Sequence, residues 1–514
     1  MGNAAGPGLA RLLLLLLLGL LAACLPEETG TEAAPTATVT AEAVQVAAVS
    51  SVAPTESSVL SLPSRALPAT FTPIPTLAKP TSTATATPSP TDTPTPTATA
   101  TVTETPFPFA SLDDSLPTPA TTIPTPVPTF EKPPGVTNIL LLGNDAPYRQ
   151  GGRTDSMVLV SINADTATAT MLSIPRDLYV YVPDWKMARI NQVLPHGHGA
   201  EYPGGGGQLV KDTILYNFGI PVDYYARIGF EGFKQVVDAL GGVEVAVSCP
   251  LEDWRLKEPD LDPEVEENWE QFALEPGIYV MDGDLALWYV RSRRTTNDFE
   301  RGRRQQQVLR AILQTGLDRS LLPQLPDLWQ AYRDSVETDM TLPLMLPLAG
   351  LAPQIRENGI QQLYLAYGPV RAWREPESGA SVQLLQWDQA EPVLAALMQP
   401  PVLNRANRAP ITVEVISDEN WIMYQLAADN LSRHGFVPVY GSGDGSTPAT
   451  TQVTYYGGNL KGSFSWLLAW ILNREEGDIR LAGEGETSAY DYRVVLGHNY
   501  QPCRPELQAP LTGE

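Results

Sequence analysis

The chain is poor in the residues that build zinc sites and in positive charge. It has 3 cysteines and 4 histidines among 514 residues, and none of them form a cluster with the four-ligand spacing of a zinc site. Lysine and arginine number 34 against 58 acidic residues, which gives a formal net charge of -24. Such a charge opposes affinity for a phosphate backbone, so the composition argues against a nucleic-acid-binding protein.

The few cysteines and histidines leave one question open. Cys249 and Cys503 are far apart in the sequence, and Cys24 lies near the N-terminus. An exported protein can form a disulfide between the two distant cysteines, but spacing alone does not decide connectivity. His196 and His198 lie in a glycine-rich stretch without cysteine partners, so we expect a loop there rather than a metal site.

The N-terminal apolar run is too short to cross a membrane. Arg11 precedes residues 12–21, which are almost all leucine, whereas a transmembrane helix needs roughly 20 apolar residues. Leu21-Ala22-Ala23-Cys24 then matches a bacterial lipobox. We therefore predict a lipoprotein signal over residues 1–24, with Cys24 lipidated and the protein anchored at the extracytoplasmic face of the cell membrane. An ordinary signal peptide with an incidental cysteine is the alternative.

Residues 25–134 lack the bulky apolar residues needed for a core. This stretch is dominated by Thr, Pro, Ala and Ser, and its proline density blocks helix and sheet. We predict a disordered stalk that holds a folded part away from the membrane. The folded part then comprises a first domain over residues 135–400, a second over 409–502 and a tail over 503–514.

The first domain alternates strand and helix patterns, which predicts a layered α/β fold. Residues 163–166 indicate a hairpin turn between two strands. The expected strands are 136–143, 157–162, 168–174, 223–229 and 243–247, and the expected helices are 208–218, 230–240, 282–291 and 308–317.

Seven of the 34 basic residues fall between residues 291 and 310. An acidic protein that gathers guanidinium groups in one place usually holds a multiply charged anion, because the planar groups pair bidentately with phosphate or carboxylate. A solvated helix face is the alternative. Apolar residues on both sides anchor the cluster to a core, and Asp298 and Glu300 lie within it.

Several collinear blocks over residues 136–320 resemble the LytR-CpsA-Psr family of cell-envelope glycopolymer transferases. The blocks are Leu142-Gly143-Asn144-Asp145, Gly152-Arg153-Thr154-Asp155-Ser156-Met157, Ser173-Ile174-Pro175-Arg176-Asp177, Arg189-Ile190-Asn191, Val237-Asp238-Ala239-Leu240-Gly241-Gly242-Val243, Tyr289-x-Arg291-x-Arg293 and Asp298-Phe299-x-Arg301-x-x-Arg304-Gln305.

The resemblance implies an α-β-α domain with a central mixed sheet and a Mg²⁺-dependent enzyme. Such an enzyme binds a polyprenyl-diphosphate-linked glycan and transfers the phospho-glycosyl portion to a cell-wall hydroxyl, commonly on peptidoglycan. A non-catalytic binder of the same lipid is the alternative function. A DNA-binding attenuator, which the family's historical name suggests, is opposed by export and by the negative charge.

The resemblance also assigns the site. It implies that Asp145 and Asp155 hold Mg²⁺ and that Asp298 lies close to the substrate diphosphate. A turn or cap role is the less favoured alternative for the two aspartates, and Arg294, Arg303 and Arg304 are expected to face solvent or brace their helix. The arginines that would grip the diphosphate are Arg153, Arg176, Arg291, Arg293 and Arg301.

Three positions depart from the family pattern or stay outside the assigned site. Ala146, Pro147 and Tyr148 precede Arg149, which makes that arginine a doubtful ligand, and Arg189 replaces a lysine. Asp177 is expected to be a turn residue or a support for a ligand rather than a ligand.

The helices over 208–218, 230–240 and 308–317 could wall an apolar tunnel for the polyprenyl chain, or simply be core.

Residues 411–496 show a second strand and helix pattern. Strands are expected at 411–416, 436–440, 452–456 and 492–496, with helices at 422–434 and 463–472. This pattern resembles the small LytR-type C-terminal domain often attached to the family. It contains no obvious catalytic constellation, so we expect a binding or scaffold role.

Replacement of Cys24 tests the predicted lipid anchor. Cys24→Ala should abolish lipid labelling and shift the protein out of the membrane fraction, because the variant lacks the thiol that carries the lipid. Cys249→Ala is the matched control and should stay labelled. Undiminished labelling of Cys24→Ala would rule out lipobox processing.

Overall fold

The computed structural model describes residues 123–145, 152–324, 326, 329, 335–376, 378–401, 410–417, 420–443, 445–458 and 463–504. The predicted signal with Cys24 and most of the predicted stalk lie outside these residues, as does Arg149. Within the described part of the chain, no helix has the length and hydrophobicity needed to span a membrane.

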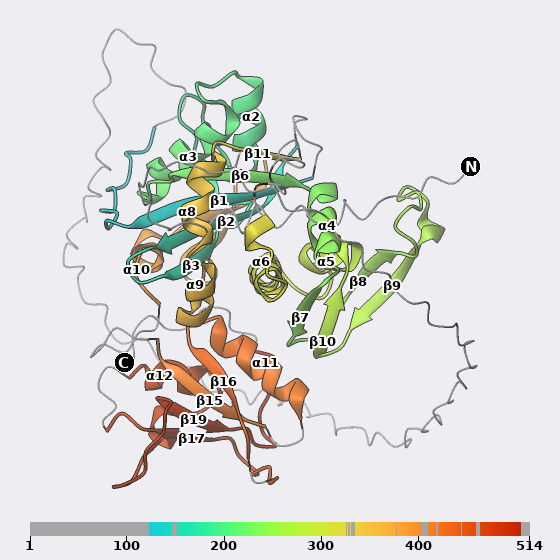
Figure 1. Cartoon of the computed structure of the whole chain (residues 1–514). Coiled ribbons are helices and arrows are strands. Elements are labelled where there is room, and N and C mark those ends of the chain that lie inside the picture. The colour runs from blue at the N-terminus through green and yellow to red at the C-terminus, as the bar shows by residue number, and fades with distance from the viewer. Residues whose placement is uncertain are drawn as a thin grey trace, which may run out of the picture. The chain divides into compact units, whose positions relative to one another are not determined.

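A six-stranded mixed sheet forms the centre of the first domain (Figure 1). Its strands are β1 (Val136–Asn144), β2 (Thr154–Asn163), β3 (Thr168–Ser173), β6 (Tyr224–Gly229), β11 (Val336–Thr338) and β12 (Ile360–Tyr364). The order is β11-β6-β1-β2-β3-β12. β1–β2, β2–β3 and β11–β6 are antiparallel, whereas β1–β6 and β3–β12 are parallel. The α/β class with a central mixed sheet is therefore confirmed.

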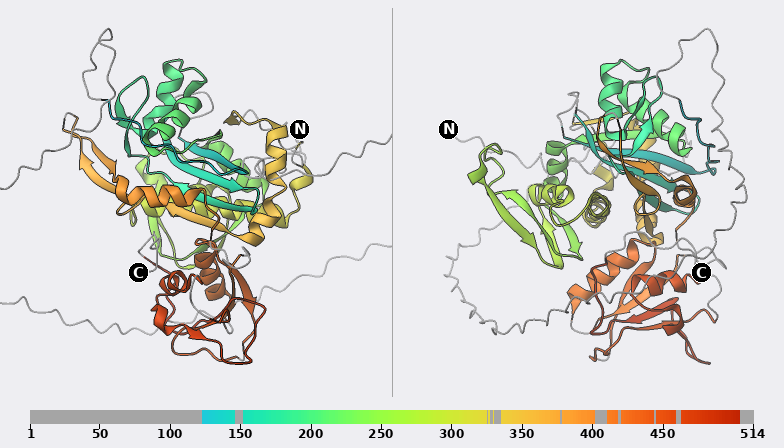
Figure 2. Two further views of the ribbon diagram at one scale, coloured as in Figure 1. Left: turned by 90° about the vertical axis from the view of Figure 1, so that its left-hand side faces the viewer. Right: turned by 180° about the vertical axis from the view of Figure 1, so that it is seen from behind.

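Helices cover both faces of this sheet (Figures 1 and 2). They are α2 (Val193–Gly199), α3 (Gly205–Phe218), α4 (Phe230–Ala239), α5 (Gly283–Arg291), α6 (Asp298–Asp318), α8 (Leu342–Ala349), α9 (Ala352–Asn358) and α10 (Trp387–Leu397). Because successive strand residues point to opposite faces, β1 supplies two cores. Ile139 and Leu141 pack with α4, α5 and α6, whereas Leu140 and Leu142 pack with α3 and α10.

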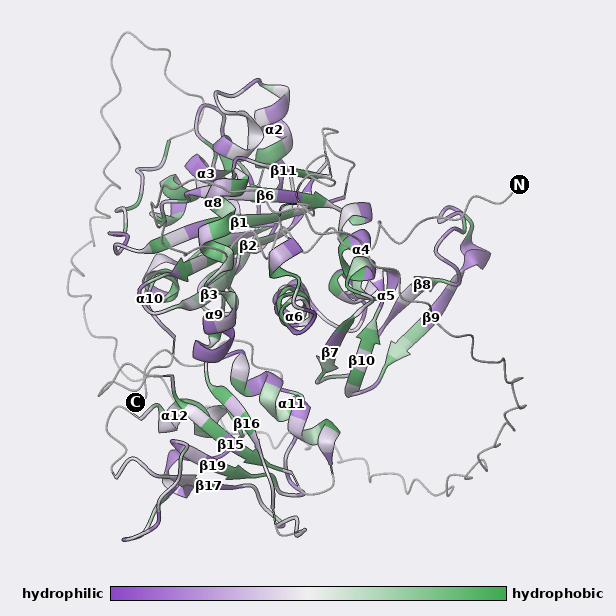
Figure 3. Ribbon diagram, viewed as in Figure 1, coloured by the Kyte–Doolittle hydropathy of each residue, from purple (hydrophilic) through white to green (hydrophobic). Residues whose placement is uncertain are grey.

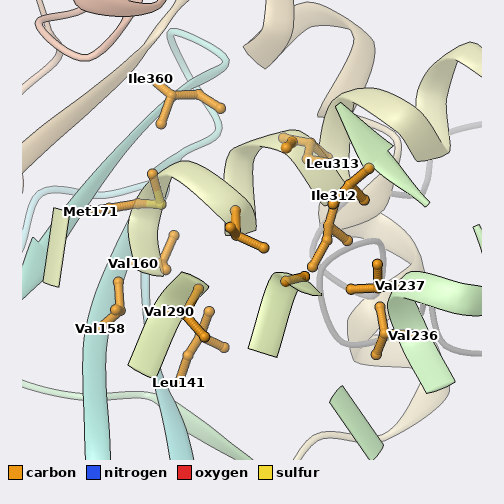
Figure 4. Close-up of a cluster of buried hydrophobic side chains, with 14 of the residues drawn as sticks. Leu141, Val158, Val160, Met171, Val236, Val237, Val290, Ile312, Leu313 and Ile360 are labelled. Carbon is orange, nitrogen blue, oxygen red and sulfur yellow. The ribbon is translucent and has the colours of Figure 1, made fainter. Parts of the chain in front are cut away.

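Burial on both faces explains why the central strands are nearly continuous runs of apolar residues. Figure 3 shows hydrophobic stretches along these strands. Figure 4 shows the first of the two cores, in which Leu141 and Val158 of the sheet face Val236, Val290 and Ile312 of the helices.

Several short elements depart from the sequence interpretation. His196 and His198 lie on the short helix α2 rather than in a loop. Residues 248–281 and 370–385, where no strands were expected, also form strands. Outside the central sheet, the strands of the first domain form four two-stranded sheets. They are β4 (Tyr179–Tyr181) with β5 (Met187–Arg189), β7 (Val243–Val247) with β10 (Gly277–Met281), β8 (Leu251–Leu256) with β9 (Trp269–Leu274), and β13 (Val370–Arg374) with β14 (Ser381–Leu385).

The segment before β1 packs on the folded domain. The N–H of Val127 donates to the carbonyl of Tyr216 at 3.1 Å, and the N–H of Phe130 donates to that of Gly219 at 2.8 Å. Lys132 pairs with Asp223 at 2.6 Å. The first folded unit therefore takes in residues before the expected boundary at 135.

The C-terminal domain is a second α/β unit with its own core. Its elements are β15 (Thr412–Ile416), α11 (Trp421–Ser432), β16 (Val437–Gly441), β17 (Gln452–Tyr455), α12 (Ser465–Ile471), β18 (Arg480–Leu481) and β19 (Tyr492–Val495). The strand order is β16-β15-β19-β17-β18. All six elements expected from the sequence are present, and β18 is an addition.

A disulfide and buried polar contacts join the two domains. Cys249 and Cys503 are bonded, with their Cα atoms 4.7 Å apart, which settles the pairing that the sequence left open. Arg310 of α6 pairs with Asp429 of α11. The N–H of Gln362 donates to the carbonyl of Arg433 at 2.7 Å. Both domains belong to one compact unit.

Candidate active site

A pocket of about 220 Å³ opens between the central sheet and helices α4, α5 and α6. Its charged lining residues lie at one edge of the sheet, and its apolar lining residues lie further along the strands and helices. The charged group is Asp155, Arg176, Arg291, Arg293 and Arg301, and the apolar group includes Leu141, Val158, Ala226, Phe230, Phe233, Val236, Leu287, Val290, Leu309 and Ile312.

The strand directions explain why the charged residues meet. β1 and β2 are antiparallel, so the end of β1 and the start of β2 share one edge, where Asn144 lies opposite Thr154. β3 runs antiparallel to β2 and ends at Ser173, opposite Val158. Asp145 just beyond β1, Asp155 at the start of β2 and Arg176 beyond β3 therefore reach the same edge, as expected for ligand-binding residues at strand ends.

The corner between α5 and α6 brings the remaining arginines to this edge. α5 ends at Arg291, and α6 begins with Asn297 as its cap, whose side-chain oxygen accepts the N–H groups of Phe299 and Glu300. Asp298 and Arg301 are three residues apart and thus on the same side of the helix. The tight corner supplies three of the five charged pocket residues.

Asp298 is the centre of an ion-pair network. Its carboxylate lies 3.7 Å from Arg176, 3.2 Å from Arg293 and 3.4 Å from Arg301. Arg176 also donates to Asp155 at 2.7 Å. Arg301 is only 6% exposed, and its burial lowers its pKa. Because Asp298 contacts three arginines, it orients their guanidinium groups at one edge of the pocket.

Arg291 and the two aspartates complete the edge. The guanidinium of Arg291 lies over the ring of Phe230, 4.3 Å from its centroid. Partial desolvation lowers the pKa of Arg291, while Asp155 and Asp145 oppose this shift. Both carboxylates are therefore within electrostatic reach of the same arginine. Asp145 is exposed just beyond β1.

Two other acidic or basic residues stay outside the pocket lining. Arg153 is exposed, and its carbonyl accepts the N–H of Asp145 at 3.5 Å. Asp177 lies 3.5 Å from Arg176 and 3.6 Å from Arg189, so it supports Arg176 from behind. Among the described residues, no group of three or more His, Cys, Asp or Glu side chains could hold a metal ion.

Arg303 and Arg304 are buried, so the option that they face solvent is wrong. Arg304 is 2% exposed and donates to the carbonyls of Tyr289 and Ser292, which braces the end of α5. Arg303 is 4% exposed and pairs with Glu300 at 2.8 Å. Burial opposes the charge of Arg303, but Glu300 raises its pKa overall. Arg294 is exposed and pairs with Glu252.

The apolar wall was only partly anticipated. α4 and α6, two of the three helices considered for a tunnel, line the pocket. α3 packs in the core on the opposite face of the sheet, so for this helix the alternative of a core role is the one that holds. Ser156 and Gln305 were missed as lining residues. Ser156 donates to Gln305 at 2.9 Å, a contact between β2 and α6 that no local sequence signal reveals.

Comparison with known proteins agrees with the family resemblance of the sequence blocks over residues 136–320. The sequence profile of the LytR_cpsA_psr family matches residues 116–398. Polyisoprenyl-teichoic acid–peptidoglycan teichoic acid transferase TagU of Bacillus licheniformis is 30% identical over 227 residues, 44% of this chain and 66% of the relative. Transferase TagT of Bacillus subtilis, with the same activity in its name, is 34% identical over 210 residues, 40% of this chain and 60% of the relative.

Both alignments span less than two thirds of the relatives' own length. The crystal structure of B. subtilis TagV aligns with a TM-score of 0.42 and 24% identity, covering 52% of this chain and 97% of that one. The family profile itself covers more than half of the chain, including every charged residue of the pocket. The chain therefore belongs to the LytR_cpsA_psr family.

Proposed function

We propose that the protein is a transferase that moves a glycopolymer from a polyprenyl-diphosphate carrier to a hydroxyl of the cell wall, such as one on peptidoglycan. One observation carries this proposal: a single pocket has arginines at its edge and apolar side chains beyond them. A polyprenyl diphosphate has the same two parts in the same order. The names of the related teichoic acid transferases support the proposal.

In this proposal the arginines hold the diphosphate. Arg176, Arg293 and Arg301 are already oriented by Asp298, so they need little reorganisation when the anion binds. Arg291 approaches from α5 and adds a fourth positive charge. Phosphoryl transfer depends mainly on positioning and charge neutralisation, which is what a set of fixed guanidinium groups supplies.

The transfer breaks one bond of the diphosphate and forms another. The acceptor hydroxyl oxygen bonds to the phosphorus that carries the glycan, and the bond to the bridging oxygen breaks. Polyprenyl phosphate leaves, the hydroxyl proton is released, and the glycan is joined to the wall by a phosphodiester. Arg176 and Arg301 stabilise the negative charge that develops on the leaving phosphate.

Mg²⁺ is part of the proposal. Mg²⁺ keeps several waters and shares phosphate oxygens, so it needs only one or two protein carboxylates. Asp145 and Asp155 fit this demand, since both act on Arg291 from the same edge. When bound, the ion would neutralise charge on the diphosphate oxygens.

We further propose that the protein works at the extracytoplasmic face of the membrane, tethered through Cys24. The lipobox and the Thr/Pro-rich stretch that follows it support this location. The carrier's prenyl chain is itself embedded in the membrane, so a tether keeps the pocket and its substrate in one compartment.

Loss of an arginine should weaken turnover strongly. Arg176→Ala and Arg301→Ala should each lower kcat/KM by about tenfold to 150-fold, because a charge-assisted hydrogen bond contributes about 1.5–3 kcal/mol. The double variant should lose less than the product of the two, since both arginines act on one anion. Initial rates with a short-chain polyprenyl-diphosphate glycan measure this. Arg356→Ala, an exposed arginine paired with Asp318, is the control. Equal losses in all variants would contradict a specific diphosphate site.

Removal of the metal should stop the reaction. EDTA should abolish turnover and Mg²⁺ should restore it, and Asp145→Asn and Asp155→Asn should each raise the Mg²⁺ concentration needed for half-maximal rate about tenfold or more, because each removes one of two carboxylate ligands. Asp165→Asn, in the exposed β2–β3 turn, is the control. Turnover that persists in EDTA would refute the metal assignment.

A larger side chain at the apolar end of the pocket should weaken binding of the prenyl chain and leave binding of the diphosphate unchanged. Val236→Phe should weaken binding of a long-chain polyprenyl diphosphate about tenfold, since each buried methylene contributes about 0.8 kcal/mol and the larger ring displaces about two. Inorganic diphosphate, which has no chain, should bind the variant as it binds the original protein. Val210→Phe adds the same bulk to α3, on the other face of the sheet, and should not discriminate between the ligands. Calorimetric titration distinguishes these results, and equal weakening of both ligands by Val236→Phe would contradict the assigned prenyl site.

A further inference from the structure

A second cleft lies where the C-terminal domain meets the first domain. Its volume is about 240 Å³. α11 forms one wall, and α6, β7 and β10 form the other; Figure 1 shows α11 beside β7 and β10. Arg310 of this cleft and Arg301 of the pocket are nine residues apart on α6, which places them on opposite sides of the helix, about 14 Å apart along its axis. The cleft is therefore separate from the diphosphate site.

Planar polar side chains line much of the cleft. The amide of Gln307 donates to Asp429 at 2.9 Å, and that of Gln425 donates to Glu244 at 3.1 Å. Gln314 lies on the same wall and is exposed. Amides and carboxylates offer donors and acceptors side by side, which is what the paired hydroxyl groups of a sugar require.

Arg310 is a buried donor with an unmet hydrogen bond. It is 5% exposed and pairs with Asp429 through Nη2, while its Nη1 has no hydrogen-bond partner among the described residues. Burial lowers the pKa of Arg310 to about 10, so the group remains charged at neutral pH. A buried charge needs polar partners, so the pair of Arg310 and Asp429 gives the wall of the cleft a polar centre.

Aromatic rings extend the cleft along α11. Trp421 and Tyr424 have ring centroids 4.9 Å apart, and Tyr440 of β16 lies 5.0 Å from Tyr424. Trp421 is 54% exposed and Tyr440 48% exposed. Tyr424 and Gln425 follow Trp421 by three and four residues, and Ser432 follows Asp429 and Ala428 by three and four. This spacing puts them on one face of the helix, which presents first aromatic rings and then polar groups.

We propose that this cleft and its aromatic extension bind a neutral saccharide chain. Ring faces pack against the C–H faces of pyranose units, and the amides, Arg310 and Asp429 take their hydroxyl or acetamido groups. A polyanion fits poorly, because Glu244 and Asp429 outnumber Arg310 among the charged lining residues. The site would hold a glycan on the side of α6 away from the reacting diphosphate. It stands independently of the transferase proposal.

Titration with defined saccharides tests the proposal on the purified full chain without any lipid donor. Chitotetraose, maltotetraose and poly(glycerol phosphate) are the probes. At least one of the two neutral saccharides should bind with a dissociation constant in the millimolar range or tighter, and Trp421→Ala and Tyr424→Ala should each weaken that binding at least fivefold. Binding of chitotetraose alone identifies an N-acetylated glycan as the ligand, and binding of maltotetraose identifies a neutral glucan.

Matched variants separate this site from the pocket. Leu481→Ala removes another exposed apolar side chain of the same domain and should bind as the original protein does. Arg301→Ala should keep saccharide binding while losing transfer, so failure of either proposal leaves the other measurable. Gln314→Ala removes an exposed amide with little risk to folding and should weaken binding at least twofold. No binding of any neutral saccharide, equal binding by Tyr424→Ala and the original protein, or a preference for poly(glycerol phosphate) would overturn the proposal.

Discussion

The candidate site depends on how the corner between α5 and α6 is fixed. Arg304 is buried beneath the end of α5 and donates to the carbonyls of Tyr289 and Ser292, while Asn297 caps the start of α6. A helix end leaves carbonyl and N–H groups without internal partners, and these two side chains satisfy several of them at once. Without this corner, Arg291 and Arg301 would not line the same pocket.

The two faces of the central sheet have different tasks. The face toward α10 and α3 is a closed core, while the face toward α4, α5 and α6 leaves a pocket among apolar side chains. The same alternation along β1 serves both, because neighbouring residues point to opposite faces. Leu140 therefore stabilises the fold, and Leu141 lines the pocket.

α6 contacts the C-terminal domain with one side and carries pocket residues on the other. Its first turn carries Asp298 and Arg301, and its middle carries Gln307 and Arg310, which contact Asp429 of the C-terminal domain. The disulfide between Cys249 and Cys503 adds a covalent link at the same junction. α6 therefore contributes residues to both the pocket and the cleft.

The sequence by itself indicated the family membership, the first strands and helices of the first domain and the six main elements of the C-terminal domain, because apolar periodicity and short charged blocks are local signals. It did not indicate the strands within 248–281 and 370–385. The structure brings the predicted site residues Asp155, Arg176, Arg291, Arg293 and Arg301 to one pocket, with Asp298 paired to three of these arginines. Their roles in binding and catalysis stay predictions. Only the tertiary structure decided which arginines are buried. Arg303 and Arg304 look like solvated helix residues in the sequence, yet their partners Glu300, Tyr289 and Ser292 become neighbours only when α6 packs on α5. The pairing of Cys249 with Cys503 and the cleft beside α11 were likewise beyond the sequence, since both depend on contacts between residues more than a hundred positions apart, which no local pattern encodes.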